Sequence, residues 1–253
     1  MTDTAATIEL SSRRDWKGAL TAVKRLMAQP GDTAQVFRIM RALNADTPKR
    51  GYERLLRAAE GGRIAYERVE LAEWLSDPAW VARFPEGSVG AAYAAFLRRT
   101  GYSAQGLAAV SRADRPKEEA HPFAWFGRRT RDVHDIWHVL TGYRADDPLG
   151  EACLVAFSYA QTKGLGWALI AVGSALTGLR HPQGRAAARA IWEGYQLGRQ
   201  AKWLLGEDYE KLLAEPIATA RARLQLGRPE RYFALDGAPR TIGPVPKTSE
   251  ATA

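Results

Sequence analysis

The 253-residue sequence contains a single cysteine, Cys153, and only four histidines. One cysteine cannot form an internal disulfide bond, and a chain without such bonds fits a reducing compartment. The residues next to Cys153 are small and apolar and include no base. We therefore expect this thiol to be a buried packing residue and not a nucleophile.

Several recognition motifs are also missing. The chain has no Gly-x-Gly-x-x-Gly fingerprint and no P-loop, so nothing in it indicates a dinucleotide or nucleotide cofactor. No helix-turn-helix, zinc-finger or RNA-binding signature accompanies the net charge of +8, so no nucleic acid is expected as a partner. The positive charge is spread in small clusters such as Lys49-Arg50. A generally solvated basic surface and a membrane-facing patch remain equally open.

No apolar run is long enough to span a bilayer, which needs about 20 residues. The most apolar run, residues 165–179, is expected to be a core helix. The alternative is a helix that lies in a membrane surface or lines a groove for a lipid tail through Trp167, Ile170 and Leu176. The N-terminal residues have the features of neither a signal peptide nor a transit peptide. We therefore expect a cytoplasmic protein peripherally associated with the inner membrane surface.

Alternating apolar and polar residues, the pattern of β-strands, are scarce too. Apolar side chains instead recur every three to four positions, as in residues 89–97, and this pattern predicts amphipathic helices. Residues 100–121 are expected to be mostly loop. We predict an all-α, single-domain helical bundle over residues 10–235, with disordered ends at 1–9 and 236–253.

The residues with the clearest chemistry are His134-Asp135-Ile136-Trp137-His138, followed later by Glu151. On a helix, His134 and His138 lie one turn apart on the same face, and Asp135 borders that face. The residues from Thr141 to Gly150 predict the end of that helix, a loop and a new helix start. In that start, Asp147 is a possible N-cap and Pro148 lies in the first turn. A tight helix–loop–helix could therefore bring Glu151 back to the histidines.

Imidazole nitrogens and carboxylate oxygens together suit Zn²⁺, Fe²⁺ or Mn²⁺. We therefore predict one divalent metal ion between the two helices, with His134, Asp135, His138 and Glu151 as its ligands. The alternative for Asp135 is that it orients a histidine without touching the ion. No further residue stands out as a separate acid or base.

Arg129 and Arg131 come just before this motif. One interpretation is a solvated helix face. The other is a cationic site for a substrate carboxylate or phosphate, which the planar fork of arginine donors suits well.

The stretch from Arg129 to Tyr143, followed by Leu149-Gly150-Glu151, resembles the signature of the coenzyme Q biosynthesis family known as "Coq four". The hallmark of that family is HDxxH, a spacer and a glutamate. Residues 84–93 and 216–226 are similar to two further blocks of the family, so the resemblance covers about residues 10–230. One departure is that the spacer before Glu151 is one residue longer than usual.

The resemblance implies a role in ubiquinone biosynthesis. The implied reaction is the metal-dependent removal of the ring carboxyl group of a polyprenylated hydroxybenzoate, an oxidative decarboxylation with hydroxylation at the same carbon. The implied partners are a polyprenylated benzoquinone precursor, the membrane surface and other ubiquinone-biosynthesis enzymes, and a homodimer is open. Two other readings remain: a non-enzymatic lipid-binding scaffold with a structural metal, and a metal-dependent hydrolase built on HDxxH.

Overall fold

The computed structural model describes residues 13–29, 32–112 and 121–235. Within these ranges the chain is helical and has no β-strand, which confirms the expected all-α fold. The predicted disordered ends, 1–9 and 236–253, lie outside the described residues. The elements are α1 (Trp16–Ala28), α2 (Thr33–Asn44), α3 (Thr47–Leu55), α4 (Gly61–Glu67), α5 (Leu71–Ser76), α6 (Pro78–Ala82), α7 (Val89–Thr100), α8 (Ala104–Arg112), α9 (Pro122–Asp132), α10 (His134–Thr141), α11 (Pro148–Thr162), α12 (Leu165–Gly178), α13 (Gly184–Gln200), η1 (Leu204–Gly206), α14 (Tyr209–Ala214), α15 (Ile217–Arg223) and α16 (Glu230–Phe233).

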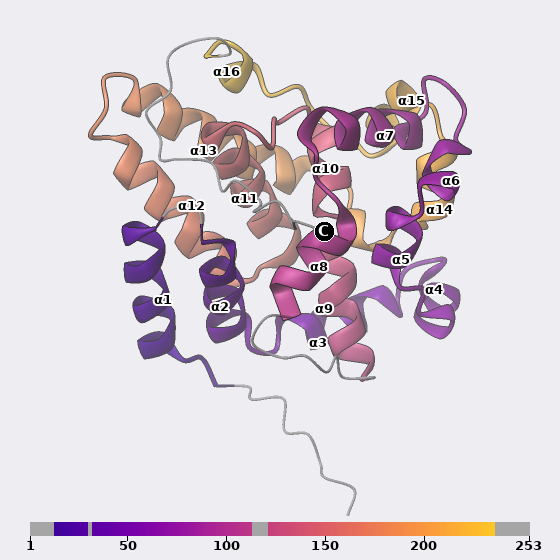
Figure 1. The fold of residues 1–253 in the computed structure, drawn as a ribbon, viewed down its shortest axis with the longest axis horizontal. Coiled ribbons are helices and arrows are strands. Elements are labelled where there is room, and N and C mark those ends of the chain that lie inside the picture. Colours follow the sequence, from indigo (N-terminus) through magenta and orange to yellow (C-terminus); the bar gives the residue numbers. More distant parts are fainter. Residues whose placement is uncertain (1–12, 30–31, 113–120, 236–253) are drawn as a thin grey trace, which may run out of the picture.

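The arrangement of the helices follows from two hydrophobic clusters (Figure 1). The smaller cluster joins α1 and α2 to α12 at one end of the molecule. The larger cluster runs from α3 to α16 and includes the apolar face of α10 and nearly all of α11. Because α11 is buried on most sides, packing holds most of the residues that follow Glu151 in place.

The close approach of α11 and α13 depends on glycine. A Cβ atom at Gly194 of α13 would lie 2.5 Å from the carbonyl oxygen of Cys153 on α11, a distance that backbone atoms cannot tolerate. Cys153 itself is fully buried and unpaired, so the sequence correctly predicted a small packing residue.

The prediction for residues 100–121 was wrong in part, because α8 forms within them. The Ser103 side chain accepts a hydrogen bond from the backbone N–H of Gly106 at 3.0 Å, and Ala104 and Ala108 are buried on one face of the helix. Small side chains let α8 pack closely against α5 and α9. A helix whose buried face is mostly alanine has a weak hydrophobic pattern, so the apolar periodicity did not predict α8.

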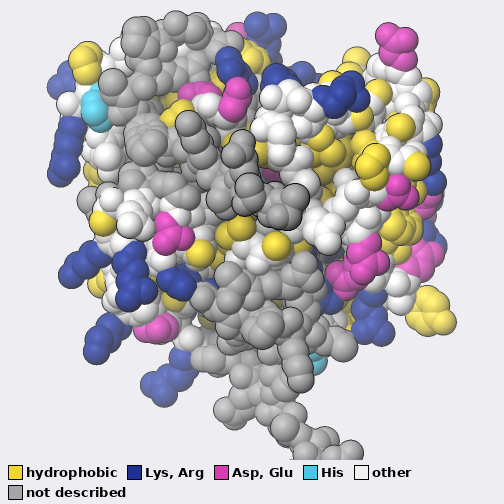
Figure 2. All heavy atoms as spheres, in the orientation of Figure 1, with side chains coloured by type: hydrophobic (Ala, Val, Ile, Leu, Met, Phe, Trp, Pro, Cys, Tyr) yellow, Lys and Arg dark blue, Asp and Glu magenta, His cyan; other side chains and the backbone are white. Residues whose placement is uncertain are grey.

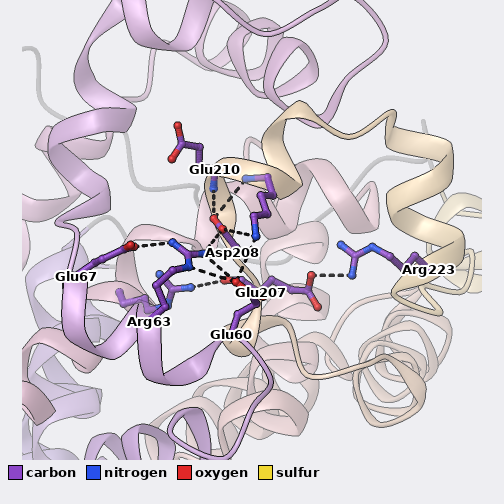
Figure 3. Close-up of polar contacts among 9 residues, drawn as sticks. Glu60, Arg63, Glu67, Glu207, Asp208, Glu210 and Arg223 are labelled. Atoms are coloured by element: carbon purple, nitrogen blue, oxygen red, sulfur yellow. Dashed lines mark hydrogen bonds and ion pairs between the residues drawn. The ribbon is translucent and has the colours of Figure 1, made fainter.

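A group of ion pairs joins α4 to the segment before α14 (Figure 3). Arg63 lies between Glu67, at 2.7 Å, and Asp208, and Arg223 pairs with Glu207 at 2.7 Å. Exposed pairs of this kind contribute little to stability. The pair between Arg63 and Asp208 connects two segments 145 residues apart in the sequence and helps to align them.

The surface carries both exposed apolar side chains and dispersed charge. On α12, Val172 and Leu176 are 55% and 60% exposed. On the face that Figure 2 shows, Lys and Arg side chains are spread along the outline of the molecule instead of gathering in one patch. Among the described residues, no helix has both the length and the apolar character that crossing a membrane requires.

Candidate metal centre

The two histidines and Glu151 are brought together by the turn between α10 and α11. Gly142 ends α10 with a φ of 84°, a conformation that glycine adopts without strain. Asp147 caps α11 by accepting hydrogen bonds from the N–H groups of Leu149 and Gly150, and Pro148 follows in the first turn. The cap and the proline were both predicted correctly. The loop between the helices brings Glu151 back to the histidines, as the sequence predicted.

The three side chains have the spacing of a metal site. Nε2 of His138 lies 3.0 Å from one carboxylate oxygen of Glu151, and Nε2 of His134 lies 3.5 Å from the other. One potential ligand atom from each of the three residues lies within 4.8 Å of the other two. Two ligand atoms about 2.1 Å from one ion at tetrahedral angles are roughly 3.4 Å apart, so the spacing fits a small divalent cation.

Hydrogen bonding supports the same interpretation. Nδ1 of His138 lies 2.9 Å from the carbonyl oxygen of Tyr143. A carbonyl can only accept, so Nδ1 carries a proton, and Nε2 is the ring atom that faces Glu151. At 3.0 Å, Nε2 and the carboxylate oxygen must share a proton or a cation, and a divalent ion could take that position. The backbone carbonyl is the kind of outer partner that holds a metal-binding imidazole in its tautomer.

The electrostatics of the group also favour a cation. Burial alone would raise the pKa of Glu151, but the imidazoles of His134 and His138 lower it to about 2, so the carboxylate is charged. Burial alone would lower the pKa of His134, but the carboxylates of Glu151 and Asp135 outweigh it and raise the pKa above its usual value. A divalent ion would relieve the same negative charge by binding in place of the proton.

Asp135 lies beside this group without joining it. Its carboxylate is 3.7 Å from Nδ1 of His134, on the side of the ring away from Glu151. It is not among the three residues whose ligand atoms converge. The geometry thus favours the alternative in which Asp135 orients His134, while its role stays a prediction.

The start of α11 is held in place from a distant part of the chain. The hydroxyl group of Tyr232 on α16 donates a hydrogen bond to the Asp147 carboxylate at 2.7 Å. A Cβ atom at Gly150 would lie 2.2 Å from the carbonyl oxygen of Arg144, so only glycine fits immediately before Glu151. No local pattern predicts the contact between Tyr232 and Asp147, because 85 residues separate them in the sequence.

Beside the three residues is a cavity of about 450 Å³. Its walls come from α2, α3, α8, α9, α10, α11 and α12 and from Trp203 and Leu205, and they are mostly apolar. His134 and Glu151 line the cavity, whereas the His138 side chain, 1% exposed, lies behind them. Glu151 is 40% exposed because it faces this space. An ion held by the three residues would therefore have its open side toward an apolar chamber.

The predicted lipid-tail residues divide between two places. Trp167 lines the cavity and stacks on the His134 ring, with centroids 5.7 Å apart and planes 9° from parallel. Ile170 lines the cavity as well. Leu176 does not, because it lies two turns further along α12 on the outer surface. The cavity walls from α2 and α3 were missed, since their apolar residues are equally typical of ordinary core helices.

The two predicted arginines are also separated. Arg131 lines the cavity but is already paired with Asp132 at 2.7 Å. Arg129 is buried elsewhere, where it donates hydrogen bonds to the carbonyl oxygens of Leu205 and Glu207 and lies 5.0 Å from the centre of the Tyr209 ring. It does not line the cavity. Arg129 is close to the motif in the sequence, but it lies on the side of α9 that faces the core.

Comparison with known proteins identifies the family of this chain. The family model described as "Coenzyme Q (ubiquinone) biosynthesis protein Coq4" matches residues 9–230. The chain belongs to this family.

Individual relatives give the same result. The chain is 32% identical to the "Ubiquinone biosynthesis protein coq4, mitochondrial" of Pyrenophora tritici-repentis, a match that covers 79% of this chain and 67% of the relative. It is 29% identical to a homologue of that protein from Nematostella vectensis, over 70% of this chain and 82% of the relative. A crystal structure of a Nostoc punctiforme protein named for ubiquinone biosynthesis superimposes with a TM-score of 0.63 at 23% identity. That superposition covers 85% of this chain and 99% of the other, and it establishes a shared fold.

Proposed function

We propose that this Coq4 family member is a metal-dependent oxidative decarboxylase of coenzyme Q biosynthesis. The substrate would be a polyprenylated hydroxybenzoate, which would lose its ring carboxyl group and gain a hydroxyl group at the same carbon. The observation that carries the proposal is the position of His134 and Glu151 in the wall of an apolar cavity. A metal used only for structure would be expected to have a closed set of ligands.

Each residue of the proposed site has a separate role. His134, His138 and Glu151 would hold the ion, which when bound supplies Lewis acidity to an oxygen substituent of the ring. The Trp167 ring keeps His134 in its orientation, and the Tyr143 carbonyl does the same for His138. The apolar walls would receive the first part of the prenyl tail and exclude water from the reacting carbon.

The overall reaction fixes which other reactants are needed. Replacing a ring carboxyl group by a hydroxyl group releases CO₂ and breaks the bond between the ring and the carboxyl carbon. With dioxygen as the oxidant, one oxygen atom enters the ring and the other leaves as water, which takes up two electrons and two protons. The proposal therefore includes dioxygen and an external two-electron reductant. Iron or manganese would suit such chemistry better than zinc.

The partners proposed for this function follow from the nature of the substrate. A polyprenyl tail is held in a membrane, so we propose that the protein works at a membrane surface and exchanges intermediates with other ubiquinone-biosynthesis enzymes. The exposed apolar residues of α12 support this, and the relatives are named as mitochondrial proteins.

The ligand set can be tested by replacing one residue at a time. His138→Ala and Glu151→Ala should each lower the metal content, because removing one ligand weakens the hold of the others. Both should abolish ubiquinone synthesis in a host that lacks its own family member. Asp135→Asn should keep the metal and lower synthesis only in part. His181→Ala, which changes a histidine in the turn between α12 and α13, is the matched control and should have no effect.

Three measurements separate the alternatives: elemental analysis of the protein, ubiquinone recovery, and the mass of the intermediate that builds up. An intermediate that still carries its carboxyl group supports the decarboxylase. Joint loss of all late intermediates would support a scaffold, and turnover of an ester with no effect on quinones would support a hydrolase. Full metal content and full ubiquinone production in both ligand variants would refute the metal site.

A further inference from the structure

A second polar feature of the cavity is an arginine held on an aromatic platform. Arg54, at the end of α3, lies with its guanidinium carbon 4.3 Å from the centre of the Trp203 ring. Trp203 in turn stacks on Phe126, with ring centroids 6.3 Å apart and planes 20° from parallel. All three residues line the cavity. The guanidinium, the indole and the phenyl ring thus form three successive layers at one wall.

A hydrogen bond holds the Trp203 ring of this platform in place. The indole N–H of Trp203 donates a hydrogen bond to the backbone carbonyl of Gln161 at 3.2 Å. The Gln161 side chain is itself buried, donates to the carbonyls of Gly198 and Lys202, and accepts from the N–H of Leu204. Because every polar atom of this glutamine is engaged, the indole has one defined orientation. The arginine stacked on it is held in a limited range of positions before any ligand arrives.

The charge of Arg54 is not neutralised by the described part of the chain. Two other arginines of the cavity have carboxylate partners, since Arg50 pairs with Asp46 at 3.0 Å and Arg131 pairs with Asp132. No described residue forms an ion pair or a hydrogen bond with the guanidinium group of Arg54, whose side chain contacts the Trp203 ring. A stacked guanidinium keeps its N–H groups at the edge of the plane, where they can bind a carboxylate or phosphate with two parallel hydrogen bonds.

The location of Arg54 also suits an incoming ligand. Arg54 and Trp203 line both the apolar cavity and a wider surface groove of about 770 Å³, so they stand where the cavity meets solvent. That groove carries further charges of both signs, with four cations besides Arg54 and four carboxylates, so no net positive charge distinguishes it. Glu151 is the only acidic side chain among the described residues that line the cavity. An amphiphile with one acidic group at Arg54 and an apolar part inside the cavity matches the lining of the cavity.

We propose that Arg54 is the docking residue for the acidic group of the ligand that fills the cavity. The recognised chemistry is a planar carboxylate or a phosphate attached to a prenyl chain. The naming of the ligand as prenylated rests on the proposed function. The docking itself needs only the cavity, the platform and the unpaired charge. Arg54 thereby takes the role that the sequence suggested for Arg129 and Arg131.

The experiment is a binding measurement on the full chain by isothermal titration calorimetry. Three probes share a fifteen-carbon prenyl chain and differ at one end: 3-farnesyl-4-hydroxybenzoate, farnesyl phosphate and uncharged farnesol. Arg54→Gln should weaken binding of at least one acidic probe by roughly 10-fold or more, the usual effect of losing a hydrogen-bonded charge. Binding of farnesol should stay within about twofold. The probe that loses affinity identifies carboxylate or phosphate as the natural group.

Two further variants make the result specific. Arg57→Gln removes a neighbouring positive charge that lines the groove but not the cavity, and it should leave all three affinities unchanged. Arg54→Lys keeps the charge but not the planar fork, so it should recover only part of the affinity. Equal weakening of all three probes by Arg54→Gln would mean that the residue only supports the wall. Unchanged affinity for both acidic probes would also overturn the proposal.

The outcome is independent of catalysis. Binding is measured without turnover, so acid-selective loss in Arg54→Gln stands even if the ligand variants at His138 and Glu151 leave ubiquinone synthesis intact. Conversely, the His138 and Glu151 variants could lose ubiquinone synthesis while Arg54→Gln binds the acidic probes as well as the parent protein does. That result would support the proposed reaction and refute the role of Arg54.

Discussion

Tyr232 offers a sharp test of how the candidate centre is held together. Its hydroxyl group reaches from α16 to the carboxylate of Asp147, which caps the helix that carries Glu151. Tyr232→Phe removes one oxygen atom and leaves the buried ring in place. The two residues that it would disturb, Asp147 and Glu151, are four positions apart at the start of α11.

The expected size of the effect follows from the burial and charge of this contact. Tyr232 is fully shielded from solvent and Asp147 is 6% exposed, so water cannot readily replace the lost hydroxyl group. A hydrogen bond to a charged group contributes about 1.5–3 kcal/mol to stability. The same oxygen also lies 3.3 Å from the N–H of Arg144, which would lose an acceptor. For a chain of this size, the loss corresponds to a fall in Tm of roughly 3–12 °C.

The assay combines thermal unfolding with metal content. Tyr195→Phe is the matched control, because its ring stacks on Tyr159 and no described residue forms a hydrogen bond with its hydroxyl group. Tyr232→Phe should lower both Tm and the retention of metal during dialysis, since a loosened cap lets Glu151 move. A Tm within 1 °C of the parent protein, with unchanged metal retention, would refute the argument that α16 supports the centre.

Two further predictions concern packing and the surface. Gly194→Ala should destabilise the fold by about 1–3 kcal/mol or more in urea unfolding, because its Cβ atom would collide with the Cys153 carbonyl. Gly173→Ala, whose Cβ atom would meet nothing within 4 Å, should be neutral or slightly stabilising, and equal effects of the two would contradict the packing. The protein should float with anionic vesicles that contain a polyprenyl lipid and bind neutral vesicles less well. Val172→Asp with Leu176→Asp should abolish this binding without unfolding the chain, and parent protein that binds neither kind of vesicle would leave α12 as plain surface.

The parts of this structure that were predictable are those with local causes. His134 and His138 share a helix face because four residues make about one helical turn. Asp147 and Pro148 begin α11 because their side chain and backbone suit a helix N-terminus. Each of these features depends on residues within a few positions of one another, so a single sequence contains the information.

The unpredicted parts depend on contacts between distant segments. Arg129 is two residues from Arg131, yet one points into the core and the other toward the cavity, because successive helix positions differ by about 100°. Leu176 and Ile170 both lie among apolar residues in the sequence. Ile170 lines the cavity only because of the way α12 packs on α2. The stacking of Arg54 on Trp203 joins residues 149 positions apart, which no local pattern can indicate.

The walls of the apolar cavity come from residues as far apart as Thr33 and Leu205. An unfolded chain cannot assemble such a chamber, so any molecule that occupies it binds the native state alone. Occupancy and resistance to unfolding are then thermodynamically linked, and a ligand at a hundred times its Kd adds about 2.7 kcal/mol to the free energy of unfolding. A rise in the Tm of this protein therefore reports that a ligand occupies the cavity. Lipid extracts can be screened in this way without knowing the ligand beforehand.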